Sequence, residues 1–264
     1  MQVAGGVTTA IAQDAVFLCT ADTKITRQKN ALNLTVRYGM ENGGKRMSKI
    51  TFGCSGTCGD TLVNVLKLYR LSHRVPISVL HYTIHENWHG KIAEIYSLLP
   101  NVTVGFIPHR DSRHKRIHSD FDHSDKMDVE PFPDFTLPDY PMPKNYNVIA
   151  PKSGKSNEGR ELHPSEVEDM IDDLENPVII GSPDSTNYCG DYVDLRGHTS
   201  IKEAFSVIRR ARSYTGMQGV MGIFALSQGI PTSMFCKTQE TYDAIHRRML
   251  LLEWKDYIKE ISVL

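Results

Sequence analysis

The sequence predicts an α/β protein with two halves, each built on a parallel sheet, that face one another across a cleft. Short β-like runs alternate with segments of helical periodicity from residue 47 to residue 107. The same alternation resumes at Tyr146, and the intervening residues 108–145, rich in Pro, Asp and His, interrupt it. Parallel strands joined by right-handed crossovers leave a ligand cleft at their carboxyl ends.

The composition is that of a packed globular protein. The chain of 264 residues is 40% hydrophobic and 23% charged, and its formal net charge of −1 provides no basic field to recruit nucleic acid. Its five cysteines, an odd number, argue against a disulfide framework and for a reducing compartment. Neither a transmembrane run nor a secretory signal is evident. We therefore expect a cytoplasmic protein of enzyme size.

Residues 1–46 have weak periodicity and stand apart from the rest. One interpretation is a translated leader, because Gly43-Gly44-Lys45 can be encoded by a purine-rich ribosome-binding sequence just ahead of a start codon at Met47. The other is a genuine irregular extension that adds one strand near Val16-Phe17-Leu18. The coding DNA would distinguish the two interpretations.

The first half, residues 47–140, is predicted to hold three strands and two helices. Strands are expected at Lys49–Phe52, Ile77–Leu80 and Val102–Ile107. Two sets of apolar residues at helical spacing predict the helices: Leu62, Val65, Leu66 and Tyr69, then Ile92, Ile95, Tyr96 and Leu99. Residues 108–145 are interpreted as a mobile excursion that ends in an interdomain linker.

The second half, residues 141–237, repeats the pattern. Strands are expected at Tyr146–Ala150, Pro177–Gly181 and Thr232–Phe235, and helices begin at Pro164, Ser200 and Gly219. Ser200 and Glu203 predict a capping box at the start of one helix. Thr238–Ile258 has the length and periodicity of one long helix, so residues 238–264 are assigned to a terminal helix.

The loop from Gly53 to Asp60 is the first candidate for a site. Gly56 and Gly59 let the backbone approach a ligand, and the following helix offers unpaired N–H groups that suit an anion. Asp60 stands where that helix begins, so its carboxylate is placed to accept a proton from an acceptor hydroxyl. Aspartate is also favoured as a helix N-cap, and this structural interpretation stays open.

Two further loops suit a diphosphate. Lys152–Ser156 follows a predicted strand but is not a P-loop, because Ile149 replaces the first glycine of GxxxxGK[ST]. A small basic loop there still suits a diphosphate, with Arg160 as a further clamp, and a solvated loop is the alternative. Gly216-Met217-Gln218-Gly219 opens another helix and also suits phosphate, unless its glycines serve only packing.

His85-Glu86-Asn87-Trp88-His89 matches the HExxH pattern of zinc peptidases. In those enzymes both histidines lie on one face of a helix. Here the motif straddles a predicted strand-to-helix turn, since Ile77–Ile84 is β-like and Gly90 follows directly. We expect no metal centre, and His85 and His89 are the ligands of a zinc-hydrolase alternative.

Gly59-Asp60 and three segments of the second half together resemble a known family. The segments are NVIAPKSGKSNEGRELHPSEVEDMIDDL, NPVIIGSPDS and DLRGHTSIKEAFSVIRRARSYTGMQGVMGIFALSQGIPTSMF. They are similar to heptosyltransferases of the ADP-heptose:lipopolysaccharide type, which have the GT-B fold. The resemblance covers most of residues 47–236, and the last segment corresponds to a helix–strand–helix–strand unit.

This resemblance implies a divergent, short GT-B protein with two Rossmann-like domains facing a central cleft. Residues 47–140 would be the acceptor-side domain, residues 141–237 the donor-binding domain, and the helix of residues 238–264 would cross back to the first domain. Asp60 would be the catalytic base. The donor-binding residues would be Lys152, Ser153 and Arg160 by the diphosphate, Asp184 and Thr199 by the nucleoside or sugar, and Gln218 and Gly219 at the helix start that faces the diphosphate sugar.

The predicted function is transfer of a sugar from a nucleoside-diphosphate sugar to a hydroxyl of a glycan or other acceptor, with no cofactor. This chain departs from the family at Gln218-Gly219-Val220, where Asp-Thr-Gly is usual, and at Ile223, where a histidine is usual. A binding protein that has lost the chemistry is therefore an alternative, besides the zinc hydrolase. The charge argues against a nucleic-acid partner, although a modified base stays open as acceptor.

Overall fold

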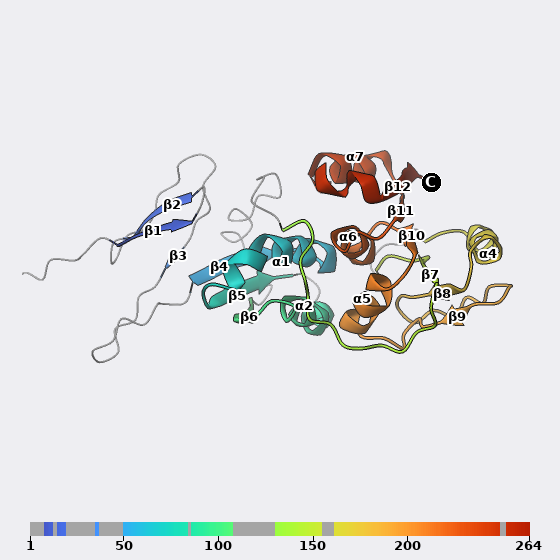
Figure 1. Cartoon of the computed structure of the whole chain (residues 1–264), viewed down its shortest axis with the longest axis horizontal. Coiled ribbons are helices and arrows are strands. Elements are labelled where there is room, and N and C mark those ends of the chain that lie inside the picture. Colours follow the sequence, from blue (N-terminus) through green and yellow to red (C-terminus); the bar gives the residue numbers. More distant parts are fainter. Residues whose placement is uncertain are drawn as a thin grey trace, which may run out of the picture.

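The computed structural model describes residues 50–83, 86–107, 130–154, 161–248 and 252–264, and within residues 1–46 three short strands only. Two α/β units lie side by side along the long axis of the molecule (Figure 1). The first unit contains residues 50–107 and the second contains residues 147–263. Each unit is centred on its own sheet, so the predicted α/β class with parallel sheets is confirmed.

The sheet of the first unit has the order β3-β4-β5-β6. Its parallel strands are β4 (Ile50–Ser55), β5 (Ile77–Tyr82) and β6 (Val102–Ile107). The crossovers carry α1 (Cys58–Ser72), then a short 3-10 turn (Glu86–Trp88) and α2 (His89–Tyr96). These elements agree with the alternation predicted for the first half.

Residues 1–46 contribute three strands where one was expected. The strands are β1 (Thr8–Ala12), β2 (Ala15–Cys19) and β3 (Thr35–Val36). β1 and β2 form a separate antiparallel pair, and β3 pairs antiparallel with β4 at the edge of the first sheet. The strand expected near Val16-Phe17-Leu18 therefore corresponds to β2, but β3 is the one that extends the sheet.

The sheet of the second unit is parallel throughout and has the order β12-β11-β10-β7-β8-β9. Its strands are β7 (Asn147–Ala150), β8 (Pro177–Ile179), β9 (Val193–Asp194), β10 (Ser213–Met217), β11 (Thr232–Cys236) and β12 (Ile258–Val263). Its helices are α4 (Pro164–Asp173), α5 (Ile201–Arg209) and α6 (Val220–Ser227). The chain leaves β7 toward β8 on one side and returns to β10 on the other, which creates a topological switch point between β7 and β10.

The capping box predicted for α5 is confirmed. The backbone N–H of Ser200 donates to Oε2 of Glu203 at 2.7 Å, and the backbone N–H of Glu203 donates to Oγ of Ser200 at 3.3 Å. Two otherwise unpaired N–H groups at the helix start are thereby satisfied. The start of α5 is therefore fixed by local sequence.

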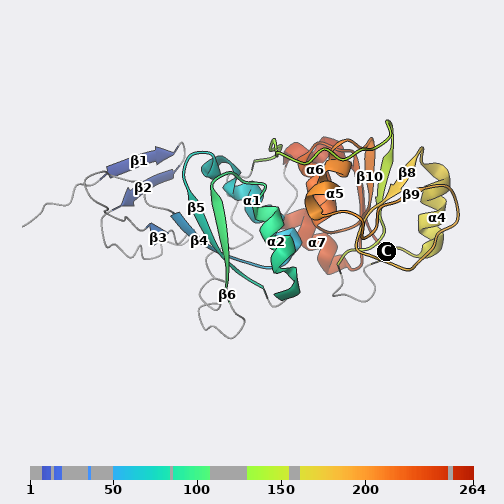
Figure 2. The same ribbon diagram turned by 90° about the horizontal axis from the view of Figure 1, so that it is seen from below.

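The two units share one apolar core. Helices α1 and α2 of the first unit pack against α6 and α5 of the second, and Figure 2 shows these helices between the two sheets. Phe205 of α5 stacks on Phe224 of α6 with ring centroids 3.9 Å apart. On the far side of the second sheet, α4 covers a smaller core that includes Val167 and Ile171.

Residues 130–145, called the strap here, have no helix or strand but belong to the packed fold. Phe135 is 1% exposed, and its ring lies 5.6 Å from that of Tyr69 on α1 and 6.2 Å from that of Phe224 on α6. Oγ of Ser206 donates to the carbonyl oxygen of Pro138 at 2.6 Å. The expected linker is thus fastened to both units, whereas residues 108–129 of the predicted excursion lie outside the described part.

The prediction of one long terminal helix is wrong. α7 (Gln239–Arg248) is followed by a 3-10 turn (Leu252–Tyr257) and by β12, which pairs with β11 in parallel. Trp254 holds this segment against the strap. It is 2% exposed, and its Nε1 donates to the carbonyl oxygen of Pro131 at 2.8 Å. β12 also supplies hydrogen-bond partners to an edge that would otherwise be open. The chain end joins the second sheet and does not cross back to the first.

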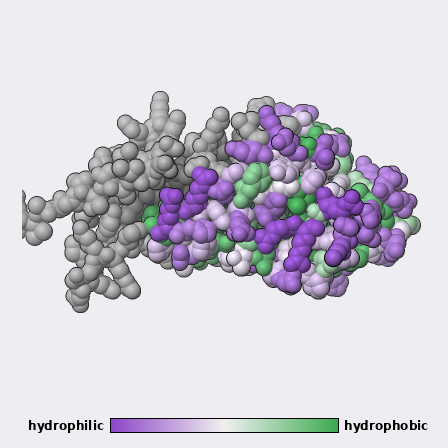
Figure 3. Space-filling view, viewed as in Figure 1, coloured by the Kyte–Doolittle hydropathy of each residue, from purple (hydrophilic) through white to green (hydrophobic). Residues whose placement is uncertain are grey.

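Hydrophilic residues predominate on the surface of the described units in the view of Figure 3, with smaller hydrophobic patches between them. Within the described residues, none of the helices has the length and apolar character that crossing a membrane requires.

Candidate functional site

Asp60 lies in the first turn of α1 and closes a capping box with Thr57. Its Oδ2 accepts hydrogen bonds from the backbone N–H of Thr57 at 2.7 Å and from Oγ1 of Thr57 at 3.0 Å. The N-cap is Thr57, and Asp60 is the third residue of the helix. Asp60 therefore does cap the helix, but from the third helical position and not as the N-cap itself. Its carboxylate satisfies a helix-end N–H group.

Gly56 makes room for the Asp60 side chain. Its φ of +118° lies in a region that side-chain-bearing residues rarely adopt, and an added Cβ would lie 2.5 Å from both Cβ and Oδ2 of Asp60. Glycine is thus required here by contact with Asp60, a reason other than the predicted approach of a ligand, which stays a prediction. Any larger residue would displace the candidate base.

A buried histidine, which sequence reasoning missed, supports the same loop. Nε2 of His81 lies 3.2 Å from the carbonyl oxygen of Gly56, and Nδ1 lies 3.1 Å from the hydroxyl of Tyr96. A carbonyl can only accept, so Nε2 carries the proton and Tyr96 donates to Nδ1. Burial lowers the pKa of His81 to about 4. A neutral imidazole therefore fixes the backbone that precedes Asp60.

The two loops predicted to bind a diphosphate meet at the switch point of the second sheet. Lys152 and Ser153 follow β7, while Gln218 and Gly219 follow β10, the neighbouring strand. A Cβ added at Gly219 would lie 2.6 Å from Oγ of Ser153. Ligands of open α/β sheets bind in the crevice outside such a switch point. The fold thus brings these candidates together although 65 residues separate Ser153 from Gln218 in sequence.

The start of α1 packs against the start of α6. A Cβ built on Gly59 would lie 3.9 Å from the backbone nitrogen of Val220 and 3.8 Å from Cδ1 of Ile223. Ile223 is 4% exposed and takes the position at which the resemblance leads one to expect a histidine. The helix turn that holds Asp60 is therefore adjacent to the helix start that follows Gly219.

Lys152 faces two carboxylates. Its Nζ lies 2.9 Å from Oε2 of Glu161 and 3.9 Å from Oδ2 of Asp184, and its side chain is 41% exposed. The hydrogen bond from Lys152 to Glu161 raises the pKa of the lysine. Asp184 accepts hydrogen bonds from the backbone N–H and the hydroxyl of Thr186, and the backbone N–H chiefly lowers the pKa of this carboxyl. Both groups are therefore charged at neutral pH.

The remaining two predicted donor-binding residues are Arg160 and Thr199. Arg160 lies outside the described residues. Thr199 precedes Ser200, the N-cap of α5, and within the described part of the chain no other candidate residue bonds to it. Both therefore stay predictions from the family resemblance.

The part of the HExxH motif that the structure describes, residues 86–89, straddles a turn and a helix start. Glu86–Trp88 form the 3-10 turn and α2 begins at His89, whose ring stacks on Phe106 with centroids 4.0 Å apart. His85 lies outside the described residues. Among the residues that are described, no three His, Cys, Asp or Glu side chains gather as metal ligands would.

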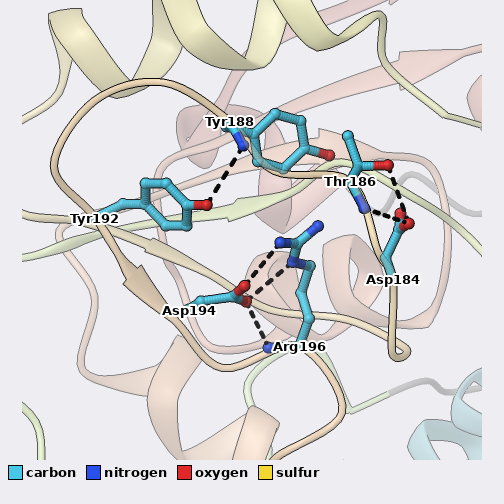
Figure 4. Close-up of polar contacts among 6 residues, drawn as sticks. All are labelled: Asp184, Thr186, Tyr188, Tyr192, Asp194 and Arg196. Atoms are coloured by element: carbon cyan, nitrogen blue, oxygen red, sulfur yellow. Dashed lines mark hydrogen bonds and ion pairs between the residues drawn. The ribbon is translucent and has the colours of Figure 1, made fainter.

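A second polar cluster lies beyond Asp184, and sequence reasoning did not find it. It consists of Tyr188, Tyr192, Asp194 and Arg196, contributed by the segments that follow β8 and flank β9 (Figure 4). Nε and Nη2 of Arg196 donate to Oδ1 and Oδ2 of Asp194 at 2.9 and 2.7 Å. The Tyr188 ring centroid lies 5.0 Å from Cζ of Arg196. In the sequence, only the closeness of the two tyrosines, at positions 188 and 192, hints at this cluster.

Comparison with known proteins gives one informative likeness. No family model matches the chain, and no curated protein matches it in sequence. The solved structure of E. coli ADP-heptose LPS heptosyltransferase II covers 81% of this chain and 90% of its own, at 12% identity and a TM-score of 0.52. The dodecameric iron-containing glycosyltransferase TibC from enterotoxigenic E. coli H10407 covers 70% of this chain and 56% of its own, at 16% identity and a TM-score of 0.42. The likeness to heptosyltransferase II shows that the chain has a heptosyltransferase-like GT-B fold.

Proposed function

We propose that this protein is a glycosyltransferase that moves a sugar from a nucleoside-diphosphate sugar to an acceptor hydroxyl. The observation that carries the proposal is the meeting of Ser153 and Gly219 at the switch point, next to the helix turn of Asp60. A diphosphate bound there would face backbone N–H groups at the start of α6 and the ammonium of Lys152. Asp184 would accept hydrogen bonds from hydroxyls of the ribose or the sugar.

In this proposal the two units are Rossmann-like domains, with the acceptor on the first and the donor on the second, across a central cleft. The carboxylate of Asp60 takes the proton of the acceptor hydroxyl while the acceptor oxygen bonds to the anomeric carbon. The bond between that carbon and the phosphate oxygen breaks, and the nucleoside diphosphate leaves with the electron pair. Lys152 and the start of α6 stabilise its growing charge, so the step uses no cofactor.

One observation favours the non-catalytic alternative, a protein that binds the nucleotide sugar without transferring it. Asp60 is engaged with Thr57, and Ile223 offers no polar group to a donor. A thermal-shift panel of nucleoside diphosphates and their sugars, with and without Zn²⁺, tests donor binding itself. A ligand at a hundred times its dissociation constant stabilises the fold by about 2.7 kcal/mol. If no nucleotide raises the unfolding temperature and Zn²⁺ alone does, the glycosyltransferase proposal fails. The zinc-hydrolase alternative, with His85 and His89 as ligands, is then favoured.

A further inference from the structure

Arg196 presents a buried donor that the described protein does not use. The residue is 6% exposed, and Nη1 is inaccessible to solvent and has no hydrogen-bond partner among the described residues. Figure 4 shows this nitrogen on the side of the guanidinium away from Asp194, toward the gap between Tyr188 and Thr186. A buried N–H group without a partner is costly. Such a donor is typical of a site that a ligand completes.

The charge around Arg196 favours a neutral ligand group. Asp194 binds Nε and Nη2 with both of its oxygens, which compensates the guanidinium charge. Asp184 stands nearby as a second carboxylate, and its pKa is lowered chiefly by the backbone N–H of Thr186 and in smaller part by Lys152 and Arg196. Because Asp194 already compensates the guanidinium charge, a phosphate gains little there, whereas a carbonyl oxygen accepts from Nη1 without adding charge.

The ring surfaces beside Arg196 favour a flat ligand. Tyr188 and Tyr192 are half-buried, and their ring centroids are 6.2 Å apart in an edge-to-face arrangement. Tyr188 lies over the guanidinium, so a ligand reaches Nη1 only when this ring moves aside. A nucleobase could then stack on Tyr188 and meet Nη1 with its edge.

The three polar groups suit the three parts of a nucleoside diphosphate. Lys152 stands at the diphosphate loops, Asp184 lies 3.9 Å from its Nζ, and Figure 4 shows Arg196 in the same neighbourhood as Asp184. An ammonium suits phosphate, a carboxylate suits ribose hydroxyls, and a guanidinium N–H suits a base acceptor. The base is therefore expected at Arg196.

We propose that Arg196 selects a donor whose nucleobase carries an exocyclic carbonyl oxygen, such as guanine, hypoxanthine or uracil, over adenine. This inference rests on the proposed function and deepens it. Guanine and hypoxanthine present O6 and N7 as acceptors on one edge, whereas adenine shares the N7 acceptor but presents an amino donor at position 6, so discrimination requires that position 6 faces Nη1. Against Nη1, the adenine amino group would leave two donors facing one another.

The test measures dissociation constants of GDP, IDP, UDP and ADP by titration calorimetry on the full chain. IDP and ADP form a matched pair, because they differ only at position 6 of the purine and its neighbouring nitrogen. We expect at least one of GDP, IDP and UDP to bind about tenfold more tightly than ADP, the discrimination that one well-placed contact provides. ADP as the tightest ligand overturns the inference but leaves the proposed function standing. Absence of binding by all four overturns the inference, and the proposed function fails as well only if the full thermal-shift panel shows no nucleotide binding.

Variants assign the preference to Arg196. Arg196→Lys keeps a cation beside Asp194 but has one nitrogen in place of the three of the guanidinium, so Nη1 is lost and the preference over ADP should fall about tenfold. Arg212→Lys is the matched control, since Arg212 is exposed and pairs with Glu175 at a distance from the site. An unchanged preference in Arg196→Lys contradicts the assignment. If that variant does not fold, the wild-type comparison of IDP, GDP and UDP with ADP still decides the claim.

Discussion

Nε2 of His81, on β5, lies 3.2 Å from the carbonyl oxygen of Gly56, in the loop that leads to Asp60. This hydrogen bond joins the centre of the first sheet to the loop that holds the proposed base. Because burial lowers the pKa of His81 to about 4, the imidazole donates this bond as a neutral group. Protonation of His81 would place a charge in the core below Gly56.

Stability should therefore depend on the protonation of His81. Its folded-state pKa is below the value of about 6.5 in an unfolded chain, so its contribution is complete above pH 6.5 and is lost as pH falls toward 4. The loss amounts to about 2 kcal/mol by pH 5. Urea unfolding of wild type and His81→Gln at pH 7.5, 6.5 and 5 measures it as the difference between two curves. Parallel curves would show that His81 does not titrate in this way.

Gly219→Ala should weaken donor binding with little effect on the fold. The backbone at Gly219 is extended, with a φ of 171° that any residue adopts, but the new Cβ would press on Oγ of Ser153 at 2.6 Å. Loss of the Ser153 contact to a charged phosphate is expected to weaken nucleotide binding about tenfold. Gly90→Ala is the control, because a Cβ at Gly90 meets nothing within 4 Å. Equal affinities in the two variants would remove Gly219 and Ser153 from the donor site.

Trp254 should contribute strongly to the stability of the whole chain. Trp254→Phe removes the hydrogen bond to Pro131 in the strap and leaves a small cavity, so we expect a loss of about 1–3 kcal/mol in unfolding free energy. Trp88→Phe is a matched control, since Trp88 is only half-buried in the 3-10 turn. Denaturant unfolding measures both variants. A larger effect at Trp88 would contradict the assigned role of the chain end.

The elements predicted correctly are those whose local pattern and packing agree. Strands such as Val102–Ile107 are apolar runs between turns, and the helix at Ser200 has its capping box. The chain end is different: Ile258–Val263 becomes a strand because β11 offers an open edge and Trp254 is held by the strap. Trp254 and Pro131 lie more than a hundred residues apart in sequence, and periodicity does not register such a contact.

The site was predictable only in part for the same reason. Glycines, a lysine and a carboxylate at strand ends indicate a phosphate site, and the fold does bring Ser153 to Gly219. His81 lies inside a strand, and the inferred role of Arg196 depends on its contacts with Asp194 and Tyr188. A side chain that acts through tertiary contacts carries no local sequence signal.

The central claim is sugar transfer with Asp60 as the base, and Asp60→Asn tests it most directly. Asparagine keeps an oxygen that can accept from the backbone N–H of Thr57, so the start of α1 should survive. The measurement is release of nucleoside diphosphate from the sugar nucleotide that binds, together with its dissociation constant, in wild type and variant. We predict at least about a hundredfold slower release with nearly unchanged binding. Unchanged release, loss of binding together with release, or no release by the wild type would contradict the account.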